Sequence, residues 1–221
     1  WGSFDYSSQE PRLLVHYCGV VNKENPLVSN MIDQYQSDDV DFHQMVADMA
    51  SISRKEAKTV NLGIMYGMGK QKLANTLDVK LEEANELLDT YHRKVPFVKQ
   101  LADQVMARAQ KMGRVRTVLG RSCRFDMWEE KKYGPGIRRA FTYKALNRLI
   151  QGSAADQTKK AMVDCYNEGL VPLLTVHDEL CFSISSQKQA DKITEIMEQG
   201  LQLNVPSKVD QELGKDWGEV G

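Results

Sequence analysis

Two acidic residues that lie far apart in the sequence could bind metal ions together. Asp5 follows a short apolar stretch that predicts a strand, and Asp178 lies between two apolar runs that predict a tight antiparallel hairpin. If these elements share a sheet, the two carboxylates meet at its edge. Such a pair suits two Mg²⁺ ions about 4 Å apart, which stabilise the attacking and leaving oxygens of phosphoryl transfer. The alternative for Asp178 is an ordinary polar turn, where Asp is common.

A stripe of four residues on one predicted helix could bind a nucleotide. Arg54, Lys58, Leu62 and Tyr66 are spaced four residues apart, so they share one face of the helix. Two cations near a helix N-terminus suit an anionic triphosphate, and the aliphatic and aromatic side chains could pack against a sugar and a base. The alternative is an ordinary amphipathic helix with exposed cations and with Leu62 and Tyr66 buried.

Two amides could contact a nucleic-acid duplex. Asn147 and Gln151 lie four residues apart on a predicted helix and therefore face the same way. Side-chain amides suit the hydrogen-bond acceptors of a minor groove, which occur at every base pair. Helix capping or hydrogen bonds between helices are the alternative roles for this pair.

The charge is distributed unevenly along the chain. The net charge is −1, but residues 99–148 contain 13 Lys and Arg against 4 Asp and Glu, a local charge of +9. The segment from Asp178 to the end carries −5. The basic segment is compatible with a polyanionic partner, although a solvated surface is an equal alternative.

The length and composition predict an ordinary globular protein. At 221 residues the chain can form one large domain or two small ones. Its apolar runs are too short to span a bilayer and no leader opens it, so we expect a cytoplasmic protein with no membrane partner. The four cysteines are scattered and predict reduced structural thiols. Because residue 1 is Trp rather than Met, we expect upstream sequence to be missing.

Hydrophobic periodicity predicts a mixture of helices and antiparallel strands. Ser53 and Glu56 predict a capping box at the start of one helix, and Gly67 suits its end. Residues 22–40 predict a loop, and Tyr133–Gly136 predicts a loop before a helix. The predicted helices are 10–17, 42–50, 54–66, 81–95, 96–112, 137–167 and 189–203, with hairpins at 114–125 and 173–184, a strand end at 4–7 and a last strand near Val209.

In five segments the chain resembles the family A (Pol I-like) DNA polymerases. In chain order, Asp5–Arg12 (DYSSQEPR) is similar to motif A, DYSxxExR, and Asp41–His43 (DFH) to the DIH element. Arg54–Gly67 (RKEAKTVNLGIMYG) is similar to motif B, RxxxKxxxFGxxYG, and Asn147–Asp156 to the NxxxQGxxAD segment. Val176–Glu179 (VHDE) is similar to motif C. Five matches in order make coincidence a poor explanation.

The resemblance implies a metal-dependent catalytic site. Asp5 and Asp178 would hold two Mg²⁺ ions, for which Mn²⁺ can substitute. Glu179 would lie beside them, and the carbonyl of Tyr6 would be a further ligand. Lys58 would be a third catalytic residue, because the family uses this lysine to assist pyrophosphate departure.

The resemblance also implies binding sites for a nucleotide and for DNA. His43, Arg54 and Lys58 would contact the triphosphate of a dNTP. Glu10 would be a steric gate whose carboxylate fills the space of a ribose 2′-OH, and Tyr66 would lie at the template base. The resemblance implies three further residues that would contact the primer-template duplex: Asn147, Gln151 and His177.

Some positions depart from the family pattern. Leu62 stands at a nucleotide-binding position where Phe or Tyr is usual, so it offers no ring or hydroxyl to the sugar. Pro11 replaces a usual Leu, Tyr143 and Lys144 stand where an Arg is common, and only ten residues separate His43 from the start of motif B. These features favour a phage source, which would place the protein in the host cytoplasm.

The expected fold is α+β. An antiparallel palm sheet with packed helices would use residues 1–30 (motif A) and 140–221 (motif C), and residues 31–139 (motif B) would form mostly helical fingers. No segment matches a thumb, an exonuclease or the first part of the palm, so we expect the chain alone to be weakly active or inactive.

Two other functions remain alternatives. A single-subunit RNA polymerase shares the palm and fingers plan, but Glu10 and the Asp178–Glu179 pair favour DNA synthesis. A non-catalytic nucleic-acid-binding module would keep its binding after loss of either aspartate.

Overall fold

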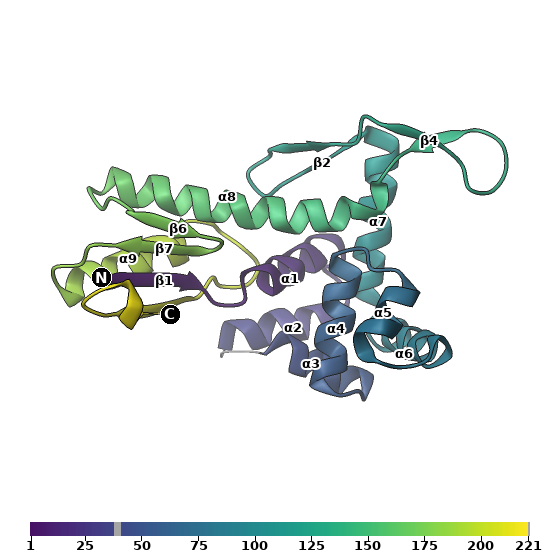
Figure 1. Cartoon of the computed structure of the whole chain (residues 1–221), viewed down its shortest axis with the longest axis horizontal. Coiled ribbons are helices and arrows are strands. Elements are labelled where there is room, and N and C mark those ends of the chain that lie inside the picture. Colours follow the sequence, from purple (N-terminus) through teal and green to yellow (C-terminus); the bar gives the residue numbers. More distant parts are fainter. Residues whose placement is uncertain (38–40, 221) are drawn as a thin grey trace. The chain divides into compact units, whose positions relative to one another are not determined.

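The computed structural model describes residues 1–37 and 41–220, and these form two compact units (Figure 1). Unit 1 comprises Trp1–His16 and Gln151–Gly221, and unit 2 comprises Tyr17–Ile150. The boundaries therefore fall at 16/17 and 150/151, whereas the sequence suggested 30/31 and 139/140. The names palm and fingers stay predictions for these units.

Unit 1 is built on an antiparallel sheet. Within the described residues its strand order is β6-β7-β1-β8, formed by β6 (Leu174–Val176), β7 (Glu179–Phe182), β1 (Gly2–Tyr6) and β8 (Val209–Leu213). The hairpin β6–β7 and the last strand β8 confirm the sequence prediction. The central position of β1 brings motif A between the hairpin that carries motif C and the last strand of the chain.

An apolar core fixes this sheet to two helices. The rings of Phe4 and Phe182 meet edge to face with centroids 5.5 Å apart. They share a buried cluster with Leu180, with Ala161 from α8 (Ala145–Asn167) and with Ile193 from α9 (Gln187–Gln199). Burial of this cluster holds the strands in register and so positions the polar residues at their ends.

Unit 2 is mostly helical. It contains the end of α1 (Gln9–Val21) and then α2 to α7, followed by hairpins β2–β3 and β4–β5 and the 3-10 turn η1 (Thr142–Lys144). The bounds are α2 Pro26–Ser37, α3 Phe42–Ala50, α4 Arg54–Met65, α5 Lys70–Leu77, α6 Leu81–Lys94, α7 Pro96–Met112, β2 Arg114–Arg116, β3 Ser122–Arg124, β4 Trp128–Glu130 and β5 Ile137–Arg139. The mixed architecture confirms the predicted α+β class.

Local sequence signals explain where the central helices of unit 2 begin and end. The Asp41 side chain accepts hydrogen bonds from the first turn of α3. Ser53 and Glu56 form the predicted capping box of α4. Gly67, which follows α4, has φ +65°, a conformation that favours glycine. These signals hold the residues of motif B on a regular helix.

Two sequence predictions were wrong. The predicted loop 22–40 contains helix α2, whose buried side chains Val28, Met31 and Tyr35 form an apolar stripe hidden among polar residues; residues 38–40 lie outside the described part. The predicted helix 137–167 begins only at Ala145, because residues 137–139 pair as β5 with β4. The Gly/Pro cluster is therefore the loop of a hairpin. Helix α5 was not predicted.

Within the described residues, no helix is both long and apolar enough to cross a membrane.

The core of unit 1 gives a stability prediction. Phe182→Ala should lower the free energy of unfolding by about 3–5 kcal/mol, because it leaves a cavity beside Phe4. Tyr166→Ala is the matched control in the same unit, since this side chain is 65% exposed, and should change stability by less than about 0.5 kcal/mol. Urea denaturation measures both, and equal losses would contradict the core assignment.

Candidate active site

Carboxylates from neighbouring strands of unit 1 converge near Asp5. On β1, Asp5 lies opposite Glu179 of β7 and opposite Asp210 of β8. Asp178 lies in the turn before β7 and shares a side-chain hydrogen bond with Asp5. The preceding His177 has φ +54°, an uncommon conformation for a residue with a side chain. The structure thus brings the predicted pair, Asp5 and Asp178, into contact.

The surroundings of Asp5 favour its protonated form. Burial, together with the negative charges of Asp178, Glu179 and Asp210, raises the pKa of Asp5 to about 6. The hydrogen bond to Asp178 acts in the same direction. A proton or a cation is therefore needed to relieve the repulsion within this cluster.

The donor set fits a hard divalent cation. Asp5 and Asp178 supply carboxylate oxygens close enough to share a proton. Among residues 1–37 and 41–220, no group of three or more His, Cys, Asp or Glu side chains is arranged to hold a metal ion by itself. A carboxylate pair suits Mg²⁺, which usually takes one or two protein carboxylates and completes its shell with water and substrate phosphates.

The other two predicted metal ligands have partners of their own. Glu179 Oε1 accepts hydrogen bonds from Ser3 Oγ at 2.5 Å and from Cys181 Sγ at 3.1 Å. The phenol of Tyr6 donates to the carbonyl of Met197 at 2.8 Å, so its ring belongs to the core. The Tyr6 carbonyl is the group relevant to a metal, and both ligand roles stay predictions.

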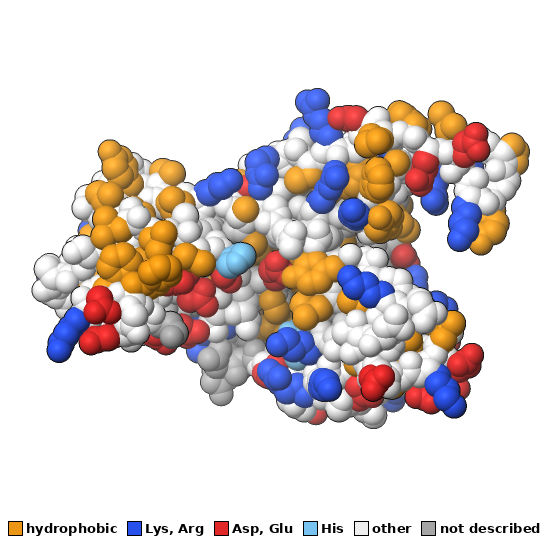
Figure 2. All heavy atoms as spheres, in the orientation of Figure 1, with side chains coloured by type: hydrophobic (Ala, Val, Ile, Leu, Met, Phe, Trp, Pro, Cys, Tyr) orange, Lys and Arg blue, Asp and Glu red, His pale blue; other side chains and the backbone are white. Residues whose placement is uncertain are grey.

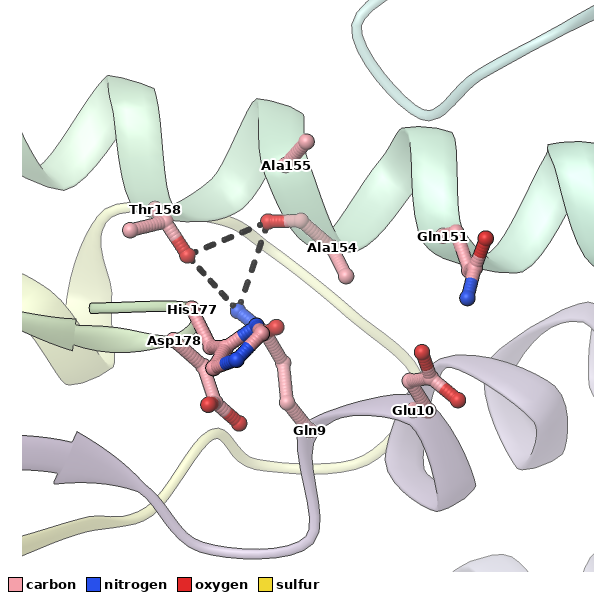
Figure 3. Close-up of a pocket in the computed structure, with 8 residues that line it drawn as sticks. All are labelled: Gln9, Glu10, Gln151, Ala154, Ala155, Thr158, His177 and Asp178. Carbon is pink, nitrogen blue, oxygen red and sulfur yellow. Dashed lines mark hydrogen bonds between the residues drawn. The ribbon is translucent and has the colours of Figure 1, made fainter. Parts of the chain in front are cut away.

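A pocket of about 350 Å³ opens beside Asp178 within unit 1 (Figure 3). Gln9 Nε2 donates to Thr158 Oγ1 at 3.2 Å and lies 3.4 Å from the carbonyl of Ala154, which fixes the start of α1 against α8. Figure 3 shows Glu10 and Gln151 together at one end of this pocket. The lining residues are Gln9, Glu10, Gln151, Ala154, Ala155, Thr158, His177 and Asp178.

In unit 2, the predicted triphosphate contacts gather around α3 and the start of α4. Arg54 Nε donates to Asp41 Oδ2 at 2.6 Å. Burial lowers the pKa of His43, Asp41 opposes this, and the positive charges of Lys58 and Arg54 lower it further. His43 therefore lies within electrostatic reach of both predicted cations.

The predicted stripe of α4 lies on its exposed side. Arg54 and Lys58 are exposed, Leu62 is half-buried and Tyr66 is 41% exposed. The buried face of the helix includes Asn61 instead. The alternative in which Leu62 and Tyr66 are core residues is therefore wrong, while the nucleotide contacts themselves stay predictions.

The predicted DNA contacts fall in both units. Asn147 is half-buried in unit 2, whereas Gln151 and His177 line the pocket of unit 1. Figure 2 shows Lys and Arg side chains over the part of unit 2 that contains the β2–β3 hairpin. This surface is part of the basic segment, and its role in DNA binding stays a prediction.

Sequence reasoning missed residues that support the site. Asp210 was visible only as a polar residue in the predicted last strand, and its approach to Asp5 depends on the pairing of β8 with β1. Gln9 stood within motif A without an assigned role. Asn61 carried no signal except its place one residue before Leu62.

Comparisons with known proteins identify the family of the chain. The family model for DNA polymerase family A matches residues 1–219. A DNA-directed DNA polymerase of Pseudomonas phage M6 is 40% identical, over 99% of this chain and 38% of the relative. DNA polymerase I of Geobacillus stearothermophilus is 34% identical, over 96% of this chain and 25% of the relative.

A solved structure shows the same fold. The POL domain of Pol1 from M. smegmatis, in complex with DNA primer-template and dNTP, has a TM-score of 0.80 at 30% identity. The similarity covers 98% of this chain and 39% of that chain. The chain belongs to DNA polymerase family A, and it spans well under half the length of each of these relatives.

The raised pKa of Asp5 gives a pH prediction. The carboxyl ionises near 3.8 when unperturbed and near 6 in the folded state, so the folded chain retains a proton between these values. The free energy of unfolding should therefore fall as the pH rises from about 4 to about 6. Asp5→Asn should remove this part of the pH dependence, as measured by urea denaturation across the range.

The matched control for this measurement is Asp191→Asn, which changes an exposed carboxylate on α9. Its free energy of unfolding should fall between about pH 4 and pH 6 as that of the wild type does. An unchanged slope in Asp5→Asn would show that Asp5 does not carry the retained proton.

Proposed function

We propose that the chain is the catalytic part of a template-directed DNA polymerase, which transfers a nucleotide from a dNTP to a primer 3′-OH and releases pyrophosphate. The observation that carries this proposal is the contact between Asp5 and Asp178 on the central sheet of a family A chain. Because the chain spans 38% of its phage relative, activity, substrates and partners of the whole protein are all part of the proposal.

The carboxylates of unit 1 would form the metal site. Asp5 and Asp178 would hold two Mg²⁺ ions, or Mn²⁺ in their place, with Glu179 and the Tyr6 carbonyl completing the protein ligands. Bound ions of this kind activate the attacking oxygen and stabilise charge on the leaving group. Glu10, at the pocket beside Asp178, would exclude a ribose 2′-OH and so select dNTPs.

The cluster around α3 and α4 would bind the triphosphate. His43, Arg54 and Lys58 supply hydrogen-bond donors and positive charge within one unit, which suits a phosphate chain. Lys58 would stabilise the departing pyrophosphate. Leu62 and Tyr66, on the same side of α4, would pack near the sugar and the template base.

A primer-template duplex would be the second substrate. The structural relative is a complex with DNA primer-template and dNTP, which supports this partner for the present chain. Asn147, Gln151 and His177 would contact the duplex near the primer end. We also propose a thumb and an upstream palm segment as parts of the whole protein, which would act in the cytoplasm, and in that of the host if the source is a phage.

The alternatives predict different behaviour. An RNA polymerase would extend with NTPs, and the family match weighs against it. A non-catalytic binding module would keep its affinity for primer-template without the aspartates. The clustering of Asp5 with Asp178 and Glu179 weighs against it, because an ordinary polar turn needs no such cluster.

Primer extension tests the proposal. The full-length protein that carries this chain should extend a primer with dNTPs and Mg²⁺, and Asp5→Ala or Asp178→Ala should each lower the rate on the order of a hundredfold or more. Asp191→Ala, on the exposed side of α9, is the control and should retain activity. Tight primer-template binding with no extension by the wild type would favour the binding module.

The proposed gate makes a separate prediction. Glu10→Ala should increase incorporation of NTPs relative to dNTPs, because it empties the space beside the sugar. Gln151 lines the same end of the pocket, so Gln151→Ala is the control. This variant should weaken extension without improving the use of NTPs. Equal discrimination in wild type and Glu10→Ala, measured with single-nucleotide extension, would remove the gate from the proposal.

A further inference from the structure

A chain of hydrogen bonds in unit 2 connects the core to His43. Tyr91 of α6 donates its hydroxyl to Asn61 Oδ1 on α4, and Asn61 Nδ2 lies 3.1 Å from His43 Nδ1 on α3. Asn61 and Tyr91 are both 0% exposed. A fully buried amide on the helix of motif B therefore touches a residue that belongs to the proposed triphosphate site.

The chemistry of the three groups sets the direction of these bonds. An amide side chain has an acceptor oxygen and a nitrogen that only donates. Burial raises the pKa of Tyr91, so its hydroxyl keeps its proton and can donate to Asn61 Oδ1. Asn61 Nδ2 is then left to face His43, and Nδ1 of the ring must accept.

The opposite orientation of the Asn61 side chain, with Oδ1 and Nδ2 exchanged, is unfavourable. It would place Asn61 Nδ2 against the Tyr91 hydroxyl, whose proton would need another acceptor. Within the described residues, Asn61 is the hydrogen-bond partner of that hydroxyl. A buried hydroxyl proton without an acceptor is costly, which favours the orientation given above.

The surroundings of His43, burial above all, favour the neutral ring. Burial lowers the pKa of His43, Asp41 opposes this, and Lys58 and Arg54 of α4 lower the pKa further, so the net direction is down. In a neutral ring whose Nδ1 accepts, the single proton is on Nε2.

We propose that Asn61 is a positioning residue that holds His43 in the Nε2–H tautomer, so that the ring presents a neutral N–H donor to a phosphate oxygen of the incoming nucleotide. This inference rests on the proposed function, since it takes the triphosphate as the ligand. The tautomer itself does not depend on that function. A fixed donor beside Lys58 and Arg54 adds directional recognition of phosphate without adding a further charge.

Nitrogen-15 NMR of the four histidines tests the tautomer directly, with His43→Gln assigning the signal. At pH 7.5 His43 should have a protonated Nε2 and an unprotonated Nδ1. Asn61→Asp should reverse or abolish this pattern, because a carboxylate accepts from both Tyr91 and a protonated Nδ1, and the pKa of His43 should rise. Tyr91→Phe, the milder variant, should give a mixture of tautomers because it frees the amide to turn.

Asn75→Asp is the matched control, since it makes the same change on the exposed side of α5 and should leave the His43 signals unchanged. An Nδ1–H tautomer in the wild type would overturn the proposal. So would a His43 spectrum that does not respond to Asn61→Asp in a folded protein.

Nucleotide kinetics of the full-length protein test the second half of the proposal. Asn61→Asp should raise the KM for dNTP roughly tenfold, the loss expected for one hydrogen bond to an anion, and should change kcat less. In a His43→Ala background the same substitution should have little further effect. An unchanged KM, or equal effects in both backgrounds, would overturn the positioning role.

A wild-type protein that extends no primer would instead contradict the proposed function, while the NMR result would still decide the tautomer.

Discussion

The crowding of carboxylates at Asp5 is the constraint on which unit 1 depends. Pairing of β1 with both β7 and β8 places Asp5 beside Glu179 and Asp210, and the turn before β7 adds Asp178. Like charges at such distances are unfavourable, and the apolar contacts of Phe4 and its neighbours maintain the strand register despite them. The sheet therefore carries a cluster of carboxylates whose mutual repulsion a proton or a bound cation would relieve.

Unit 2 has the opposite electrostatic character around motif B. Arg54 and Lys58 lie in the first two turns of α4, where the helix dipole favours anions, and His43 lies beside them with a lowered pKa. In the proposed function these donors of unit 2 would bind the phosphate oxygens of a triphosphate. The buried Tyr91 and Asn61 would then explain why one of these donors is neutral and fixed in direction.

The sequence predicted the parts of the site that depend on local patterns. Asp178 between two apolar runs and the stripe that starts at Arg54 follow from periodicity and turn chemistry, and both lie where the patterns place them. Asp210 was missed because its role depends on strand pairing across almost the whole chain, which no local signal reports. Asn61 was missed for a similar reason, since its partner Tyr91 is thirty residues away. The errors in α2 and β5 arose where polar residues hid a buried stripe and where a short strand resembled the start of a helix.

Binding of Mn²⁺ to the chain in the presence of a dNTP tests the central claim most directly, because it reports on the carboxylate pair without requiring turnover. Electron paramagnetic resonance should show tight binding near pH 7.5 that weakens as the pH falls through about 6, where Asp5 takes up its proton. The same measurement on Asp178→Asn should show a large loss of affinity, while Asp191→Asn binds as the wild type does. Equal Mn²⁺ binding by the wild type and Asp178→Asn, with no pH dependence near 6, would contradict the assignment of Asp5 and Asp178 as the metal site.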